Sequence, residues 1–243
     1  MKEFDKHKET LIRQVKDAFG NNLVSLLVYG SYVKGNFIEK RSDINLFMIC
    51  RKINPDQLAS LYRFIRHWRR KINLALPLLL TESEVRNSTD IFPMEYLDIR
   101  EFHQVLYGKD IFRNLRINDS FLRLELENQV KSKLIFLRSS FMRSSRHPRY
   151  LKSVLFNTLA TVHVILNNLI KLHHKKSSDS IDSLVLEAET ILKTPLTVLQ
   201  KMIRLKQGRL RLKRNELVSL FKEFILEMEK LSEHVDKFKG KKK

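Results

Sequence analysis

The sequence is poor in cysteine, glycine and proline, and these shortages exclude several classes of protein. One cysteine among 243 residues can form no internal disulfide and no Cys-based zinc cluster. Six glycines and five prolines are too few for a collagen-like or low-complexity chain. Hydrophobic residues make up 43% of the chain, which predicts a folded protein with a buried core.

Long apolar runs are also missing. The first twenty residues lack the apolar stretch that a secretory signal needs, and no run approaches the length of a membrane-spanning helix. Together with the lone Cys50, which suits a reducing compartment, this predicts a soluble, cytoplasmic protein without a membrane partner.

Acidic residues are scarce, and their distribution is uneven. The chain holds 27 Asp and Glu against 46 Lys and Arg, a net charge of +19, so polyanions are expected partners. Residues 1–114 carry 19 basic and 14 acidic side chains, whereas residues 115–243 carry 27 and 13. The second half is therefore the basic half.

The densest basic run in that half contains no acid. It comprises Lys201, Arg204, Lys206, Arg209, Arg211, Lys213 and Arg214. Smaller clusters lie at residues 138–152 and in a tail at residues 239–243. Such clusters can bind RNA, DNA or the phosphates of a nucleotide, and the alternative is that they are solvated helix faces. No aromatic residue interrupts the 201–214 run, so a base-stacking platform is not expected there.

The first half alternates between two periodicities. Short apolar runs predict strands over residues 23–29, 44–50 and 74–80, the last broken by Pro77 and so placed at an edge or a bulge. Apolar residues at steps of three and four predict helices over residues 4–19 and 55–71. This order of elements describes a small domain that combines a sheet with helices.

From about Asp119 onward the pattern is helical throughout. Helices are expected over residues 119–142, from Pro148 to about residue 173, over residues 181–192, from Thr194-Pro195, and from near Asn215. In the last helix a heptad seam consists of Leu217, Phe221, Phe224, Met228, Leu231, Val235 and Phe238. The seam fits a bundle of about five helices, and a coiled-coil dimer is the alternative.

Chemistry is concentrated in one segment between the first two predicted strands. Gly30 and Ser31 form a turn after the first strand, and Ser42 and Asp43 stand just before the second. A glycine corner allows close approach of a phosphate, and the amides at the start of a short helix favour an anion. Alternation along the strand places Asp43 and Asn45 on one face, where two oxygen ligands could hold Mg²⁺.

This segment resembles the signature of the nucleotidyltransferase superfamily of DNA polymerase β, a Gly-Ser turn followed about ten residues later by an Asp-x-Asp pair. The resemblance implies that Gly30, Ser31 and Ser42 bind the phosphates of an NTP and that Asp43 is a catalytic ligand of Mg²⁺. Asn45 departs from the pattern because it stands where the second aspartate belongs and brings no negative charge. The specific motif covers about sixteen residues.

The family also uses a third carboxylate on a later strand, and residues 74–80 contain no acid. The acid-bearing run at residues 92–99, followed by Leu-Tyr-Gly at residues 106–108, is similar to that later part of small nucleotidyltransferases. On this basis Glu95, in preference to Asp98, is expected as the third metal ligand and as a catalytic acid. The alternative is that both acids face solvent on an edge strand.

These patterns predict an α+β fold with two domains. Residues 1–115 are expected to form a nucleotidyltransferase-like mixed sheet with flanking helices, and residues 116–243 a basic all-α bundle. The resemblance implies transfer of NMP from Mg-NTP to a hydroxyl or phosphate acceptor. One alternative is a degenerate member that binds nucleic acid or a partner protein, and another is a scaffold that uses the seam at residues 217–238. The plainest alternative is that the Gly-Ser and Ser-Asp pairs are ordinary turns.

Overall fold

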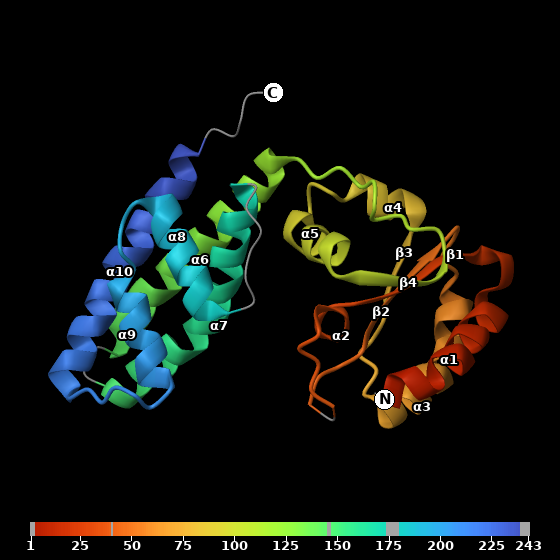
Figure 1. Ribbon diagram of the computed structural model, residues 1–243, viewed down its shortest axis with the longest axis horizontal. Coiled ribbons are helices and arrows are strands. Elements are labelled where there is room, and N and C mark those ends of the chain that lie inside the picture. Colours follow the sequence, from red (N-terminus) through yellow and green to blue (C-terminus); the bar gives the residue numbers. More distant parts are fainter. Residues whose placement is uncertain (1–2, 40, 145–146, 174–179, 239–243) are drawn as a thin grey trace. The chain divides into compact units, whose positions relative to one another are not determined.

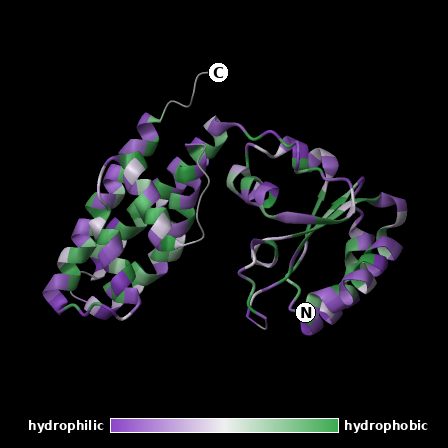
Figure 2. Cartoon of the chain, in the orientation of Figure 1, coloured by the Kyte–Doolittle hydropathy of each residue, from purple (hydrophilic) through white to green (hydrophobic). Residues whose placement is uncertain are grey.

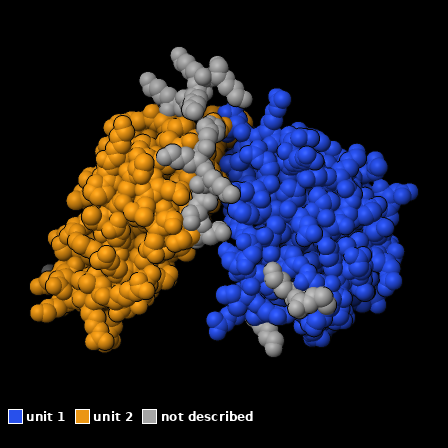
Figure 3. Space-filling model, in the orientation of Figure 1, with its two compact units in different colours: residues 1–118 blue, residues 119–243 orange. Residues whose placement is uncertain are grey.

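A computed structural model describes residues 3–39, 41–144, 147–173 and 180–238 (Figure 1). The basic tail at residues 239–243 lies outside the described residues. The chain divides into two compact units, Met1–Asn118 and Asp119–Lys243 (Figure 3). The first combines a sheet with helices and the second is helical throughout its described residues, so the predicted α+β class is confirmed.

The first unit is built on a mixed four-stranded sheet in the order β3-β2-β1-β4. Its strands are β1 (Leu23–Tyr29), β2 (Asn45–Cys50), β3 (Leu78–Thr81) and β4 (His103–Gly108). β1 pairs antiparallel with both β2 and β4, whereas β2 and β3 run parallel. The central strands β1 and β2 are short runs of apolar residues, largely green in Figure 2, because both of their faces are covered.

Helices cover both faces of this sheet. They are α1 (Glu3–Phe19), the one-turn α2 (Ser31–Lys34), α3 (Pro55–Ile72), α4 (Glu82–Asn87) and α5 (Pro93–Glu101), with a 3-10 turn at Gly20–Asn22. On one face α1 and α3 pack against Leu26, Leu46 and Met48. On the other face Leu27 and Phe47 pack against residues of α4, α5 and the chain that follows β4. The alternation of side chains along β1 and β2 thus produces two apolar layers.

The helix α3 is fixed at both ends by local chemistry. Asn54 caps its first turn by accepting a hydrogen bond from the Asp56 amide at 2.9 Å, and Pro55 occupies the first helical position. Asn73 ends the helix in the left-handed conformation, with φ of 54°. The predicted helices at residues 4–19 and 55–71 are therefore confirmed.

The second unit is a bundle of five helices within the described residues. They are α6 (Asp119–Ser144), α7 (Pro148–Leu172), α8 (Ile181–Leu192), α9 (Thr197–Lys206) and α10 (Arg214–Lys237). The seam of α10 is buried from Leu217 to Val235, and Phe221 stacks on Phe141 of α6 with ring centroids 5.5 Å apart. The seam is therefore used within the bundle, which removes the surface that the coiled-coil and scaffold alternatives require.

One helix differs from expectation in its apolar length. By length and composition alone α7 could cross a membrane, although the sequence analysis found no run of that length. In the structure 61% of its most apolar stretch is buried inside the protein. The core helix of a soluble bundle can have the same length and apolar composition.

Two predicted elements need correction. The strand expected at residues 74–80 is shorter and later, because Leu74 forms only an isolated bridge with Ile44 and regular pairing with β2 begins at Leu78. The helix expected from Thr194-Pro195 begins at Thr197. The amides of Val198 and Leu199 in its first turn are capped by one side chain from a distant helix, Glu227 of α10, a contact that no local pattern encodes.

Candidate functional site

The Gly-Ser turn lies at the end of β1, directly beside the start of β2. Tyr29 pairs with Asn45, so the residues after Tyr29 lie beside those before Asn45. Gly30 has a φ of 80°, and a Cβ at this position would lie 3.0 Å from the Asn45 side-chain nitrogen. The structure thus brings the glycine corner, Asp43 and Asn45 to one end of the sheet.

The helix that follows the turn is anchored on both sides. The Gly30 amide donates to the Phe102 carbonyl at 3.2 Å, while the Gly30 carbonyl accepts from the Lys34 amide at 3.0 Å. Lys34 lies 3.8 Å from a carboxylate oxygen of Asp98 and 4.4 Å from the ring centroid of Phe102. Asp98, rather than Glu95, is therefore the acid of α5 that contacts this turn.

The packing of Tyr32 holds α2 against α1. Its ring meets Phe4 edge-on, with centroids 4.8 Å apart, and its hydroxyl donates to Asp5. Burial, followed by the bond to Asp5, raises the pKa of the Tyr32 hydroxyl. This tyrosine is a structural neighbour of the turn that the sequence analysis did not single out.

Ser42 and Asp43 are tied to α3 through Asn73. The Asn73 side-chain amide donates to the Asp43 carboxylate at 2.6 Å and to the Ser42 carbonyl at 3.2 Å. The Ser42 hydroxyl accepts from the Ile38 amide at 3.0 Å, so it is used in closing the loop. Sequence alone gives no sign of Asn73, since its role depends on the fold bringing residues thirty apart together.

Next to Asn73 the surface is hollowed. A cavity of about 440 Å³ is lined in part by Asn73, Phe37 and the basic end of α3. Two carboxylates, Glu3 and Glu39, also line this cavity and offset its positive charge. The cavity touches the partner of Asp43, but the lining that the structure gives it includes neither Gly30 nor Ser31.

The alternation expected around Asp43 is present. Ile44 and Leu46 are buried, Asp43 is exposed and Asn45 is half-buried. The neighbouring strand offers no acid. Phe47 of β2 pairs with Leu78 of β3, and the residues two positions earlier are Asn45 and Leu76. Leu76 is 79% exposed. An exposed leucine, and no carboxylate, therefore stands just before β3, the strand beside β2.

The third acid was predicted on a strand, and that prediction is wrong. Residues 93–101 form the helix α5, because Pro93 is preorganised for the first helical turn and Glu95 interacts favourably with the positive end of the helix dipole. Glu95 is exposed on α5. Among the described residues, no three His, Cys, Asp or Glu side chains gather as a metal site requires.

The predicted nucleic-acid-binding run at residues 201–214 spans the end of α9, the connection to α10 and the first residue of α10. All seven of its basic side chains are exposed. Acids of α10 lie among them: Lys201 is 3.5 Å from Glu223, and the Lys213 amide donates to Glu216 at 2.6 Å. Within this run Lys201 is therefore paired with an acid, and Glu216 places a second carboxylate beside the backbone of Lys213.

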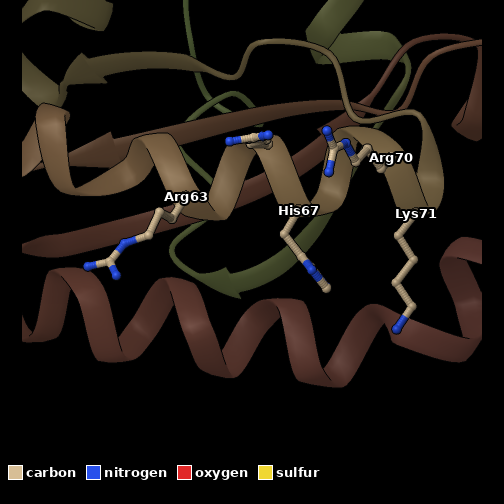
Figure 4. Close-up of a pocket in the computed structure, with 5 residues that line it drawn as sticks. Arg63, His67, Arg70 and Lys71 are labelled. Atoms are coloured by element: carbon tan, nitrogen blue, oxygen red, sulfur yellow. The ribbon is translucent and has the colours of Figure 1, made fainter.

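A second basic surface, which the sequence analysis did not consider, lies on α3. A cavity of about 360 Å³ is lined by Arg63, Arg66, His67, Arg70 and Lys71 (Figure 4). The signal was available: residues 57–81 contain no acid, as residues 201–214 do not. We call the exposed side of α3 that carries these residues the α3 basic face.

Comparison with solved structures finds proteins of similar overall fold. No protein-family model and no curated protein matches the chain. Among solved structures, the chain is similar to spectinomycin adenyltransferase AAD(9) from Enterococcus faecialis, crystallised with ATP and spectinomycin. The match covers 96% of this chain and 99% of the other, at 12% identity and a TM-score of 0.49. A likeness at this level carries no conclusion about the chemistry of this chain.

Proposed function

We propose that this chain is a nucleotidyltransferase-like protein that does not transfer nucleotides and whose function is to bind nucleic acid. The donor set beside the Gly30 turn carries the first part of the proposal. It consists of one carboxylate, Asp43, which already accepts a bond from Asn73, and one amide, Asn45. Mg²⁺ is bound mainly by carboxylates and water, so these residues do not fit a catalytic magnesium site.

Charge supports the second part of the proposal. A net charge of +19 attracts polyanions over long distances, and both units carry runs without acids, at residues 57–81 and 201–214. The cations of both runs are exposed. A nucleic acid, with its regularly spaced phosphates, is the polyanion that such surfaces suit best.

Nucleotide titrations test the first part. We expect isothermal titration with each NTP and Mg²⁺ to give no magnesium-dependent binding to the wild type or to Asn45→Asp, because the substitution still leaves the neighbouring strand without an acid. Asp43→Asn is the matched control, since it removes the remaining carboxylate. Magnesium-dependent NTP binding by the wild type that Asp43→Asn abolishes, or incorporation of labelled NMP into any acceptor, would overturn this part.

Polynucleotide titrations test the second part. We expect the wild type to bind RNA or DNA with an affinity that falls steeply between about 50 and about 200 mM salt, because bound cations release counterions from the phosphates. Absence of binding to either polymer at about 50 mM salt would overturn the proposal of nucleic-acid binding. The two parts are thus tested by separate measurements.

A further inference from the structure

The arginines of α3 lie on the side of the helix that faces away from the core. Leu61, Trp68 and Ile72 are buried, and the helical period of 3.6 residues places Arg63, Arg66 and Arg70 on the opposite side. Figure 4 shows Arg63, His67 and Lys71 directed from α3 toward the neighbouring dark red helix, α1, whereas Arg70 is not. The α3 basic face therefore presents three arginines and two further nitrogen-bearing side chains.

Contacts on the core side of α3 fix this face in place. Trp68 is 1% exposed, and its indole N–H donates to the Gln14 side chain of α1 at 2.9 Å. His67 packs edge-on against the Trp68 ring, with centroids 5.1 Å apart. A binding surface on a fixed helix loses little backbone freedom when a ligand binds.

Carboxylates approach this face only at one end, where Glu3 and Glu39 line the adjoining cavity together with Arg70 and Lys71. Among the residues that the structure describes, no carboxylate lies within ion-pair distance of Arg63, Arg66 or Arg70. Two arginines of the second unit, by contrast, are paired: Arg123 lies 2.6 Å from Glu127 and Arg138 lies 2.6 Å from Glu229. Like charges crowded around a hollow repel one another, and a bound anion relieves that repulsion.

An exposed aromatic ring lies beside the arginines. Tyr62 is 64% exposed, and on a helix it neighbours Arg66 four residues later. Bases of single-stranded nucleic acids stack on such rings, whereas the bases of a duplex are already stacked on one another. Tyr62 thus supplies a contact that an acidic protein or an inorganic anion would not use.

We propose that the α3 basic face binds single-stranded nucleic acid, with its arginines on the phosphates and Tyr62 stacked on a base. Arg63 to Arg70 spans about 10 Å along the helix, over which a strand stacked as in a duplex carries about three phosphates. Arginine, not lysine, occupies the centre of the face, and its planar group binds two phosphate oxygens at once. This inference rests on the nucleic-acid binding proposed above, but not on the loss of nucleotide transfer.

The test compares two triple variants of equal charge by fluorescence anisotropy with a labelled single-stranded 20-mer. One carries Arg63→Gln, Arg66→Gln and Arg70→Gln on α3. The matched control carries Lys222→Gln, Lys230→Gln and Lys237→Gln on α10, three exposed lysines outside both basic runs. We expect the α3 variant to bind about tenfold or more weakly, with a salt slope shallower by about 2, and the control to lose less than about threefold. Circular dichroism checks that both variants are folded.

Tyr62 provides the second arm. We expect Tyr62→Ala to weaken binding of the single strand about tenfold, Tyr62→Phe to bind as the wild type does, and neither to change binding of a 20-base-pair duplex. Equal loss in both triple variants, no loss in the α3 variant, or equal effects of Tyr62→Ala on single strand and duplex would overturn the inference. So would an α3 variant that loses binding to phosphatidylserine vesicles but not to the 20-mer. A wild type that binds no nucleic acid would instead overturn the proposed function.

Discussion

The α3 basic face and the basic run at residues 201–214 look alike in sequence, since neither contains an acid, yet their surroundings differ. Acids of α10 approach the second run, as Glu223 does at Lys201, whereas no described carboxylate is paired with Arg63, Arg66 or Arg70. The two helices are also anchored differently. Charge density along a sequence therefore does not measure the potential of the folded surface, because acids distant in sequence set part of it.

The two anchors are of opposite chemistry. Trp68 holds α3 through an apolar ring and one hydrogen bond to Gln14. Glu227 of α10 holds the start of α9, because its carboxylate accepts hydrogen bonds from the amides of Val198 at 3.1 Å and Leu199 at 3.0 Å. Burial is the main cause that raises the pKa of Glu227 to about 7. One anchor is thus independent of pH and the other is sensitive to it.

The largest effect is expected from removing the apolar anchor. Trp68→Ala should lower the free energy of unfolding of the first unit by about 3 to 5 kcal/mol, because it leaves a cavity and an unpaired Gln14. Trp68→Phe, the matched control, keeps most of the volume and should cost less. Urea denaturation followed by circular dichroism measures both. Equal stability of Trp68→Ala and the wild type would show that α3 does not depend on this anchor.

Single charge reversals compare the two surfaces directly. Arg66→Glu should weaken binding of a single-stranded 20-mer about thirtyfold, because it places a negative charge at the centre of a surface whose arginines form no ion pairs among the described residues. Arg204→Glu makes the same change on α9 and should weaken binding only a few-fold. Anisotropy at a fixed salt concentration measures both. If Arg204→Glu has the larger effect, the order of the two surfaces is the reverse of the one inferred.

The pH dependence separates the two anchors. Glu227 has a higher pKa in the folded chain, about 7, than its ordinary value of 4.5, so between these values the folded state binds more protons than the unfolded state. Its contribution to stability is full below pH 4.5 and is lost as the pH rises through about 7. The expected loss for the bundle is about 1 to 3 kcal/mol.

His234 acts in the opposite sense, because burial lowers its pKa and its neutral form is favoured as pH rises. The informative quantity is therefore the difference between the wild type and Glu227→Gln, measured by urea denaturation from pH 4.5 to pH 8. Glu227→Gln should remove the downward slope. A wild type and variant with parallel stability profiles would mean that Glu227 does not titrate in this range.

The smallest effect is expected from the surface ion pair of the second run. Lys201→Met should change the free energy of unfolding by less than about 0.5 kcal/mol, because the pair with Glu223 is exposed and solvent screens it. Thermal melts of the two proteins at low salt measure the difference. A loss of unfolding free energy above about 1 kcal/mol would indicate that the ion pair between Lys201 and Glu223 stabilises α9 more than an exposed pair is expected to.

Local patterns predicted the elements best where one residue type dominates. The strands β1 and β2 follow from continuous apolar runs, and α3, α6, α7, α8 and α10 follow from helical spacing and from prolines or small polar residues at their starts. Prediction failed where a local pattern is ambiguous, as at residues 92–99, which combine apolar residues with a proline that suits either a strand edge or a helix start. The domain boundary was predicted between residues 115 and 116, and the two compact units of the structure divide between Asn118 and Asp119.

For the candidate site, sequence reasoning placed Gly30, Ser31, Asp43 and Asn45 in one segment, and the antiparallel pairing of β1 and β2 brings them to one end of the sheet. Sequence reasoning could not find Asn73, which lies thirty residues beyond Asp43. The phosphate-binding roles of Gly30 and Ser31 and the metal-binding roles of Asp43 and Asn45 stay predictions. The missing acid on the neighbouring strand was visible in the sequence, since residues 74–80 hold none.

By itself the sequence determined the periodicity of each element, the turn that needs a glycine, the excess of positive charge and the replacement of an expected aspartate by Asn45. The charge and the replacement are read directly from composition. The periodicity and the turn depend on neighbouring residues, through local sterics and hydrophobicity. Only the tertiary structure decided that Asn73 bonds to Asp43, that Glu227 caps α9 and that Arg63, Arg66 and Arg70 form no ion pair with a described carboxylate. Each of these depends on which distant side chains meet, and packing of the core, not local pattern, selects those partners.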